Sequence, residues 1–423
     1  MNKNKDFAVV LCAFLAIFMA VFAFDSVLSS SEATTRRAPI RQRAAPSIFA
    51  SGNGTQRNPF VIRTAAQLSA FAASVNNGET YSDRYIRLGA NIDLRNVNWT
   101  PIGFYCASGG TRSFNGSFYG AGFSIFHMGA GNDARSPASA LFGALNGATI
   151  QRVCLQLVNV AGESHVGGLV GFKTGSTLRN SRVSGNVSGR YAVGGIVGSA
   201  FNGFLEGCDF SGSVTGVDGV GGLVGTMDRV TIRSARASGQ VDGAVDVGGF
   251  VGGILDGMII DSTANGVIVN GDHNVGGFVG NLVDSGRIER AAFTGQVSGN
   301  SNVGGIVGRM AAGFVVSCTM NGSVRGRAHA GGIIGEFMSG EIRRSVNSAS
   351  VDGMFSIGGI AGMMSGGLMR NNLNNGAING GEAVGGLVGN FYAEDMNFAL
   401  EANNSTGQAR GHFSTGHLVG AQP

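Results

Sequence analysis

The sequence predicts an all-β protein whose main body is a single-stranded parallel β-helix of about 27 residues per coil, preceded by an N-terminal α/β cap. Three observations lead to this prediction. A Gly-rich hexad recurs nine times at a nearly constant step, strand-like alternation recurs with it, and 73 of the 423 residues are Gly. Collagen is excluded because Gly does not occupy every third position, and apolar residues along the whole chain disfavour disorder.

The first 24 residues are predicted to be a signal peptide or a membrane anchor. Lys3 and Lys5 precede an uncharged apolar run from Phe7 to Phe24, which Asp25 closes. As a helix this run would span roughly 27 Å, just short of a bilayer core of about 30 Å, so cleavage and retention both stay open. In either case the chain is expected to leave the cytosol.

Residues 25–56 are predicted to be a flexible stalk and residues 57–137 an N-terminal cap. The stalk is rich in Ser, Arg and Pro, a composition that cannot bury a core. In the cap, Thr64 and Gln67 form a capping box ahead of an amphipathic helix that ends before Gly78. A helix laid across the open end of a solenoid would cover core residues and unpaired strand edges. Short strands after it are expected to lead into the first coils.

The repeat occupies residues 138–390, and a degenerate last coil with a C-terminal cap is predicted over residues 391–423. Hexads related to VGGLVG begin at residues 166, 193, 220, 247, 275, 303, 330, 357 and 384. Steps of 27 or 28 residues between them predict one structural unit per copy, stacked in a line. Strict alternation cannot bury both Leu169 and Val170 in one strand, so the chain is expected to bend at each Gly-Gly step. The structural glycines of these steps are Gly167, Gly168, Gly194, Gly195, Gly221, Gly222, Gly248, Gly249, Gly276, Gly277, Gly304, Gly305, Gly331, Gly332, Gly358, Gly359, Gly385 and Gly386.

The second half of each unit alternates with period two, as half-buried strands do. Strands that recur without hairpin turns must pair in parallel, so that like residues stack about 4.8 Å apart. One interior column is expected to contain Val187, Val214, Val241, Ile268, Val297, Val324, Val351 and Ile378. A second interior column is expected to hold Cys154, Cys208 and Cys318 as free, buried thiols that are too far apart for disulfides.

Several segments together resemble the GLUG-motif repeat proteins of bacterial surfaces. These are the hexads, the NPFVIRTAAQLSAF entry, ANIDL followed by WTPIG, and FNGSFYGAGFSI, and the resemblance covers about 360 residues. It implies a right-handed β-helix on an exported, adhesin-like protein. Some immunoglobulin A peptidases carry the same motif beside a zinc protease domain. None of the six His residues here lies in an HExxH motif, so protease activity is not implied.

Catalytic and metal-binding patterns are sparse in the repeat. Enzymes built on β-helices need clustered carboxylates on neighbouring coils. The outward column next to the valines contains no acid: Asn186, Ser213, Gln240, Val267, Gln296, Ser323, Ser350 and Ala377. Asp218, Asp246 and Asp272, at the corner before the hexads, are the candidate metal ligands, with solvated turn residues as the alternative. No cofactor is expected.

Three aromatic residues of the cap, Trp99, Tyr105 and Tyr119, are candidates for glycan recognition, with packing of the cap as the alternative. A net charge of +4 and scattered Arg residues disfavour nucleic acid. The predicted function is a non-catalytic, adhesin-like binding or display rod, secreted or at the cell surface. Its expected partner is an extracellular protein or glycan, and it would contact a membrane only through an uncleaved N-terminal segment. A carbohydrate-active β-helix enzyme and a structural surface-layer or spacer protein are the alternatives.

Overall fold

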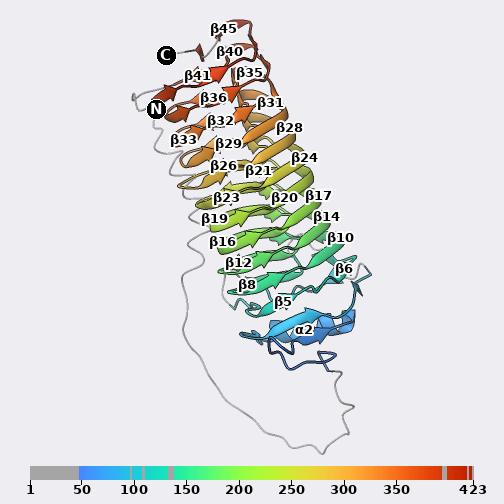
Figure 1. The fold of residues 1–423 in the computed structure, drawn as a ribbon. Helices are drawn as coiled ribbons and strands as arrows, with labels where there is room; N and C mark the ends of the chain where they lie inside the picture. Colours follow the sequence, from blue (N-terminus) through green and yellow to red (C-terminus); the bar gives the residue numbers. More distant parts are fainter. Residues whose placement is uncertain are drawn as a thin grey trace, which may run out of the picture.

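The computed structural model describes residues 47–95, 98–106, 110–131, 138–392, 398–416 and 419–421. These residues form an elongated parallel β-solenoid of about 12 turns, with the chain progressing steadily from one end of the rod to the other (Figure 1). The predicted signal or anchor over residues 1–24 and most of the predicted stalk lie outside the described residues.

No helix within these described ranges has both the length and the apolar character needed to cross a membrane.

Each coil contributes strands to two parallel sheets, here called sheet A and sheet B. In one representative coil, β14 (Arg182–Ser188) and β15 (Tyr191–Gly194) belong to sheet B and β16 (Val197–Glu206) belongs to sheet A. The chain then returns to sheet B as β17 (Asp209–Thr215), which pairs in parallel with β14. The predicted stacking of one 27-residue unit on the next is therefore confirmed.

The strands of sheet A are short and stack along the whole rod. They are β1 (Phe60–Ile62), β2 (Tyr85–Leu88), β5 (Ser117–Tyr119), β8 (Phe142–Asn146), β9 (Thr149–Gln151), β12 (Val170–Thr174), β13 (Thr177–Arg179), β16, β19 (Val224–Arg233), β22 (Val251–Ile254), β23 (Gly257–Ile260), β26 (Val279–Leu282), β27 (Arg287–Glu289), β29 (Val307–Met310), β30 (Phe314–Val316), β32 (Ile334–Phe337), β33 (Glu341–Arg343), β36 (Ala361–Met364), β37 (Gly367–Arg370), β41 (Val388–Phe391), β42 (Phe398–Glu401) and β46 (Val419–Ala421).

Sheet B contains the other strands of each coil. They are β3 (Ile92–Asp93), β4 (Asn98–Trp99), β6 (Ser124–Phe126), β7 (Gly129–Ala130), β10 (Cys154–Ala161), β11 (Ser164–Gly167), β14, β15, β17, β18 (Asp218–Gly221), β20 (Arg236–Asp242), β21 (Val245–Gly248), β24 (Thr263–Asn270), β25 (His273–Gly276), β28 (Ala292–Gly304), β31 (Thr319–Gly331), β34 (Val346–Asn347), β35 (Ser350–Gly358), β38 (Leu373–Asn374), β39 (Ile378–Asn379), β40 (Glu382–Gly385), β43 (Asn404–Ser405), β44 (Ala409–Arg410) and β45 (Phe413–Gly416).

The hexads form the sharp corner at which the chain passes from sheet B to sheet A. This bend was predicted because strict alternation cannot bury two consecutive apolar residues, such as Leu169 and Val170, in one strand. Gly195 shows why this corner needs Gly. A Cβ atom built on Gly195 would lie 2.3 Å from the carbonyl oxygen of Gly222 in the next coil and equally close to the ring of Phe210. The requirement is thus close approach of stacked backbones rather than a left-handed backbone angle.

The predicted interior column is confirmed for its first members, because Val187 pairs in register with Val214 and Val214 with Val241, all three being buried. The prediction for Ile268 is wrong. Val241 pairs with Val269, whereas Ile268 is 41% exposed.

The physical reason is a coil of 28 residues instead of 27, whose extra residue, Gly266, bulges out with φ +64°. Val267 therefore takes the place expected for Gly266 and pairs with Gly295. The outward column gains Ile268 in place of Val267 and still contains no acid.

The cysteine column is also displaced by one residue at its first member. Cys208 and Cys318 are fully buried, but Cys154 pairs with Arg182 on the outward side of sheet B and is only half-buried. Val153 holds the interior position instead, since its backbone N–H donates to the hydroxyl of Ser181 over 3.2 Å. Cys154, Cys208 and Cys318 form no disulfides.

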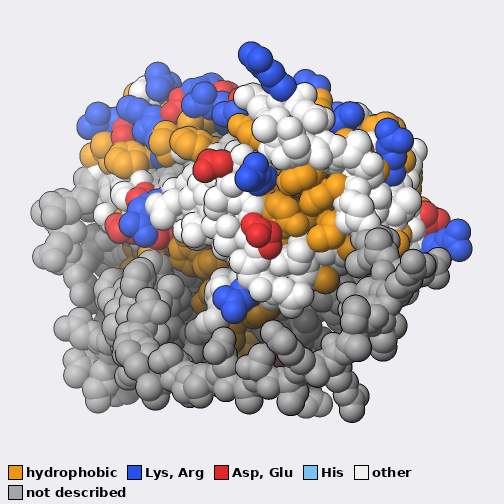
Figure 2. Space-filling model, turned by 90° about the horizontal axis from the view of Figure 1, so that it is seen from below, with side chains coloured by type: hydrophobic (Ala, Val, Ile, Leu, Met, Phe, Trp, Pro, Cys, Tyr) orange, Lys and Arg blue, Asp and Glu red, His pale blue; other side chains and the backbone are white. Residues whose placement is uncertain are grey.

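The predicted cap helix is α2 (Ala65–Asn76), at the end of the rod where the described chain begins (Figure 1). The hydroxyl of Thr64 accepts from the backbone N–H of Gln67 over 3.2 Å, and the Gln67 side chain accepts from the N–H of Arg63 over 2.8 Å. Leu68, Phe71, Ala72 and Val75 are buried against the first coils. Figure 2, which faces this end, shows apolar side chains among charged ones.

The remaining strands of residues 57–137 continue the two sheets. β1 pairs with β2, β2 with β5 and β5 with β9 in sheet A, all in parallel. In sheet B, β3 pairs with β6 and β6 with β10. This region therefore builds the first coils itself, with longer connections than the repeat.

Amide side chains form a ladder inside the last coils. The Asn347 side chain donates to Oδ1 of Asn374 over 2.8 Å, and Asn374 donates to the hydroxyl of Ser405 over 3.2 Å. Asn374 also accepts from the backbone N–H of Gly376 over 3.1 Å. These bonds satisfy buried polar groups where the interior column would otherwise be apolar.

Candidate functional site

The three predicted aromatic residues lie apart and in different environments. Trp99 is 6% exposed, and its indole N–H donates to the carbonyl of Leu141 over 3.1 Å. Tyr105 stacks on Phe172 with ring centroids 4.2 Å apart. The Tyr119 hydroxyl accepts from Arg152 over 3.1 Å. Trp99 thus packs the interior, and the structure does not combine the three into one surface.

The three predicted metal ligands occupy three different columns. Asp218 pairs with Val245 and Val245 pairs with His273, so these three residues form one column. Asp246 lies one residue after this column, and Asp272 lies one residue before it. No group of three or more His, Cys, Asp or Glu residues suited to a metal ion occurs in the described part of the chain. Asp218 and Asp246 influence each other electrostatically, but the structure does not align all three carboxylates.

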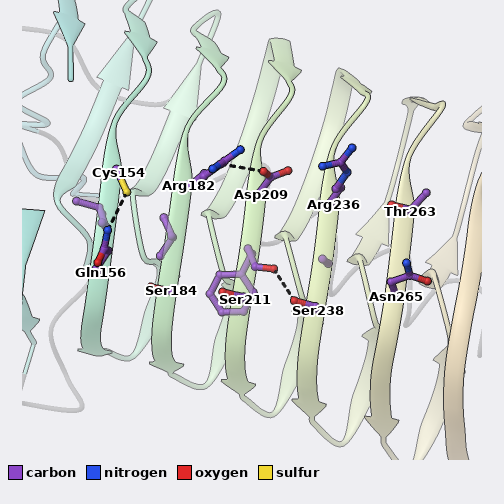
Figure 3. Close-up of a pocket in the computed structure, with 14 residues that line it drawn as sticks. Cys154, Gln156, Arg182, Ser184, Asp209, Ser211, Arg236, Ser238, Thr263 and Asn265 are labelled. Atoms are coloured by element: carbon purple, nitrogen blue, oxygen red, sulfur yellow. Dashed lines mark hydrogen bonds and ion pairs between the residues drawn. The ribbon is translucent and has the colours of Figure 1, made fainter. Parts of the chain in front are cut away.

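A groove that the sequence did not predict crosses sheet B over strands β10, β14, β17, β20 and β24 (Figure 3). Its volume is about 480 Å³. Two outward rows of side chains border it, and buried apolar residues of the same strands form its floor. The lining residues are Cys154, Leu155, Gln156, Arg182, Val183, Ser184, Asp209, Phe210, Ser211, Arg236, Ala237, Ser238, Thr263 and Asn265.

One border of the groove is a charged row. Arg182 pairs in register with Asp209, and Asp209 pairs with Arg236. The Arg182 Nε donates to Oδ2 of Asp209 over 3.1 Å, while Arg236 forms no ion pair with any described residue (Figure 3). The neutral residues Cys154 and Thr263 continue the row at its two ends. The row thus carries two positive charges around one negative charge.

The other border is a row of hydroxyl and amide groups. Ser184, Ser211 and Ser238 pair in register, with Gln156 and Asn265 at the two ends of the groove (Figure 3). Ser238 donates to the carbonyl of Phe210 over a long 3.4 Å. Hydroxyl and amide groups both donate and accept hydrogen bonds, so this border can bind polar ligands of either kind.

A polar network lines the hexad corner, where the chain passes from sheet B to sheet A. Asp246 accepts hydrogen bonds from Asn274 over 2.8 Å and from Asn281 over 3.1 Å. Asn302 donates to Asn274 over 2.9 Å and to Glu336 over 3.1 Å. Burial raises the pKa of Asp246 to about 6. The network ties successive coils together across the corner.

Three carboxylates, those of Asp228, Asp256 and Asp284, lie near the same position of three successive coils, where the chain runs through sheet A. Asp228 is 5% exposed, and its Oδ2 accepts from Nε of Arg229 over 3.1 Å. Burial raises the pKa of Asp228, Arg229 opposes this effect, and the negative charges of Asp256 and Asp284 add to it. An Asp near the same position of three consecutive repeats was the signal in the sequence that could have predicted this row.

Lys173 is fully buried in an interior column of sheet A, between Leu145 and Ala200. Its Nζ donates to the carbonyl of Asn202 over 2.6 Å. Burial lowers the pKa of this amine to about 7. Such a position could have been found from the sequence, because the matching residues of neighbouring repeats are apolar.

No family model matches the chain, and no curated protein matches it significantly. One solved structure is similar, that of a candidate immunoglobulin A1 protease from Bacteroides ovatus. It is 17% identical, the alignment covers 87% of each chain, and the TM-score is 0.36. At this level of similarity it carries no argument about function.

Proposed function

We propose that this chain is an exported, non-catalytic member of the GLUG-motif surface proteins. In this proposal it acts as an adhesin-like rod that binds an extracellular protein or glycan along the groove of sheet B. The supporting observation is the groove itself, because it extends over five successive coils and has a hydroxyl or amide side chain on one border in each of them. An extended ligand can contact such a surface at several equivalent positions.

The rigidity of the surface favours binding without a conformational change. Each groove strand is paired in parallel with the strands of the neighbouring coils, and its apolar side chains are buried beneath the groove. A preformed site loses less conformational entropy when it binds a ligand than a mobile loop does. The border side chains then determine which ligands fit.

The groove lining favours binding over hydrolysis. Glycoside hydrolysis in most enzyme families needs two carboxyl groups on either side of the scissile bond. Among the lining residues, Asp209 is the single carboxylate, and Arg182 already pairs with it. The absence of a second acid in this lining supports the non-catalytic proposal.

Export is supported by the basic and then apolar order of the first 24 residues. Fractionation of cells that produce the full chain tests this part of the proposal. Recovery from the medium or the cell surface supports it, with the size of the mature chain reporting cleavage. Recovery of an uncleaved chain from the cytosol alone would contradict it.

A binding screen of the full chain against glycan arrays, extracellular matrix proteins and whole cells tests the binding role. Saturable binding without release of new reducing ends or peptide fragments is the expected result. Lateral lattices of the purified protein combined with no binding would favour the structural-spacer alternative instead. Matched variants in the groove then connect the binding to this surface.

The carbohydrate-active enzyme remains the second candidate because of the Asp228 row. A buried carboxyl group with a raised pKa beside other carboxylates is an arrangement used for general acid catalysis. Turnover of a polysaccharide by the full chain, abolished by Asp228→Asn but retained by Asp352→Asn, would establish this candidate. Absence of turnover over a panel of polysaccharides favours the binding role.

A further inference from the structure

The charges along one border of the groove alternate in sign, so a polymer with a negative charge on every unit does not match them. Arg182, Asp209 and Arg236 stand in three successive coils, so the sign of the charge alternates along the rod axis. Matching residues of successive coils are about 4.8 Å apart. The two Arg residues are therefore roughly 10 Å apart, with a carboxylate between them.

Both Arg residues retain donors for a ligand. Arg182 uses Nε for Asp209, and its side chain is 71% exposed, so its terminal nitrogens face solvent. Arg236 forms no ion pair or side-chain hydrogen bond within the described residues. A guanidinium group binds a carboxylate through two parallel N–H donors, which gives both strength and orientation.

The remaining lining matches a sugar better than a peptide strand or a nucleic acid. The backbone groups at this face are paired between coils, so an added peptide strand would find no free edge. The aromatic residue of the lining, Phe210, is 3% exposed and offers no surface for stacking a base. Hydroxyl and amide groups such as those of Ser184 and Ser211 can bind the hydroxyl groups of a pyranose ring.

We infer that this groove binds an extended, unsulfated polysaccharide in which a uronic acid alternates with a neutral sugar. The inference rests on the proposed binding function. One pyranose unit of an extended chain is close in length to one coil, so carboxylates on alternate units meet Arg182 and Arg236. The neutral unit between them meets Asp209, which accepts hydrogen bonds from its hydroxyl groups and repels a carboxylate.

Titration calorimetry of the full chain with hyaluronan oligosaccharides tests this ligand class, because they alternate an unsulfated uronic acid with a neutral amino sugar. Polygalacturonate carries an acid on every unit, heparin is sulfated, and dextran is neutral. Hyaluronan is expected to bind most tightly of the four, with affinity that falls as salt rises. Equal or tighter binding of polygalacturonate would overturn the alternation, and equal or tighter binding of heparin would overturn the restriction to unsulfated chains.

Variants connect the ligand to the groove. Arg236→Ala is expected to weaken hyaluronan binding about tenfold or more, the effect of losing a charge-assisted hydrogen-bond pair. Arg325→Ala removes a similar exposed charge from β31 of the same sheet, outside the groove, and is expected to leave affinity unchanged. Asp209→Asn is expected to strengthen binding of polygalacturonate more than that of hyaluronan.

The possible failures are distinguishable. If both Arg236→Ala and Arg325→Ala bind hyaluronan as tightly as the unchanged protein, the groove is not the binding site, although the protein still binds. Saturable binding to cells or proteins without any binding to the four polysaccharides would overturn the ligand class alone. No binding to any glycan, protein or cell would overturn the proposed function itself.

Discussion

The side chain of Asn274 donates a hydrogen bond of 2.8 Å to Oδ1 of Asp246, one coil away along the rod. Asp246 is 5% exposed, and burial raises the pKa of its carboxyl group to about 6. The hydrogen bond from Asn274 opposes this increase, and the charge of Asp218 adds to it. The ordinary value is 3.8, so the folded protein binds more protons than the unfolded chain between about pH 4 and pH 6.

This carboxyl group therefore lowers the free energy of unfolding as the pH rises through that window. Asp246→Asn is expected to remove the decline and to stabilise the protein above pH 6 by on the order of 3 kcal/mol. The new amide can donate to Oδ1 of Asn281, a buried atom that has no hydrogen-bond partner, once the Asn281 amide turns over. Urea unfolding from pH 4 to pH 8 measures the effect. The exposed Asp83→Asn variant is the control, and an unchanged slope in Asp246→Asn would contradict the assignment.

Burial lowers the pKa of Lys173 from 10.5 to about 7, so the unfolded chain binds more protons than the folded protein between these values. The free energy of unfolding is expected to rise with pH across this window. Lys173→Met is expected to stabilise the protein at pH 7 by several kcal/mol, with roughly 5 kcal/mol as the upper bound. Thermal unfolding from pH 6 to pH 10 measures this. Lys173→Arg keeps a charge that cannot be lost, so it should destabilise at every pH; a neutral result for both variants would contradict the assignment.

Gly195→Ala is expected to cost about 3 kcal/mol or more, because the added methyl group would press on the backbone of Gly222. Gly266→Ala is the matched control. Its φ of +64° makes Ala strained, but no atom lies within 4 Å of the added methyl group. We expect a cost of about 1 kcal/mol for this control. Denaturant unfolding compares the two, and equal costs would show that close packing at the hexad corner is not limiting.

Asn374→Leu keeps the branched shape of the side chain in the interior ladder but removes its hydrogen bonds. The backbone N–H of Gly376 and the hydroxyl of Ser405 then lose partners inside the coil. We expect a loss of about 3 kcal/mol or more in the free energy of unfolding. Asn375→Leu, in the next residue, replaces an exposed side chain and serves as the control. A loss no larger than that of the control would argue against the ladder.

Burial raises the pKa of the thiols of Cys208 and Cys318 to about 12, so both should resist alkylation in the folded protein. Cys154 is half-buried at the groove border and is expected to react. Peptide mapping after iodoacetamide treatment distinguishes the three sites, and denatured protein provides the fully labelled control. Protection of Cys154 equal to that of Cys208 would contradict its outward position.

Periodicity was sufficient to predict the architecture. Residues that recur once per coil must share an environment when coils stack, so Val187 and Val214 could be assigned to one column from the sequence alone. The capping box at Thr64 was equally readable, because its hydrogen bonds join residues close in the chain. The predicted columns were wrong where a strand contains one residue more than the matching strand of the next or previous coil. The bulge at Gly266 shifted Ile268 outward, and a register shift within β10, between Leu155 and Val158, placed Cys154 one position from its expected column.

The sequence by itself therefore determined which residues stack along the rod. Only the tertiary structure decided which columns lie beside each other around the coil. Asp246 and Asn281 are 35 residues apart and meet because the chain folds back at the hexad corner. The physical reason is that a repeat length defines the translation from coil to coil, whereas the path within a coil depends on bend angles that packing sets.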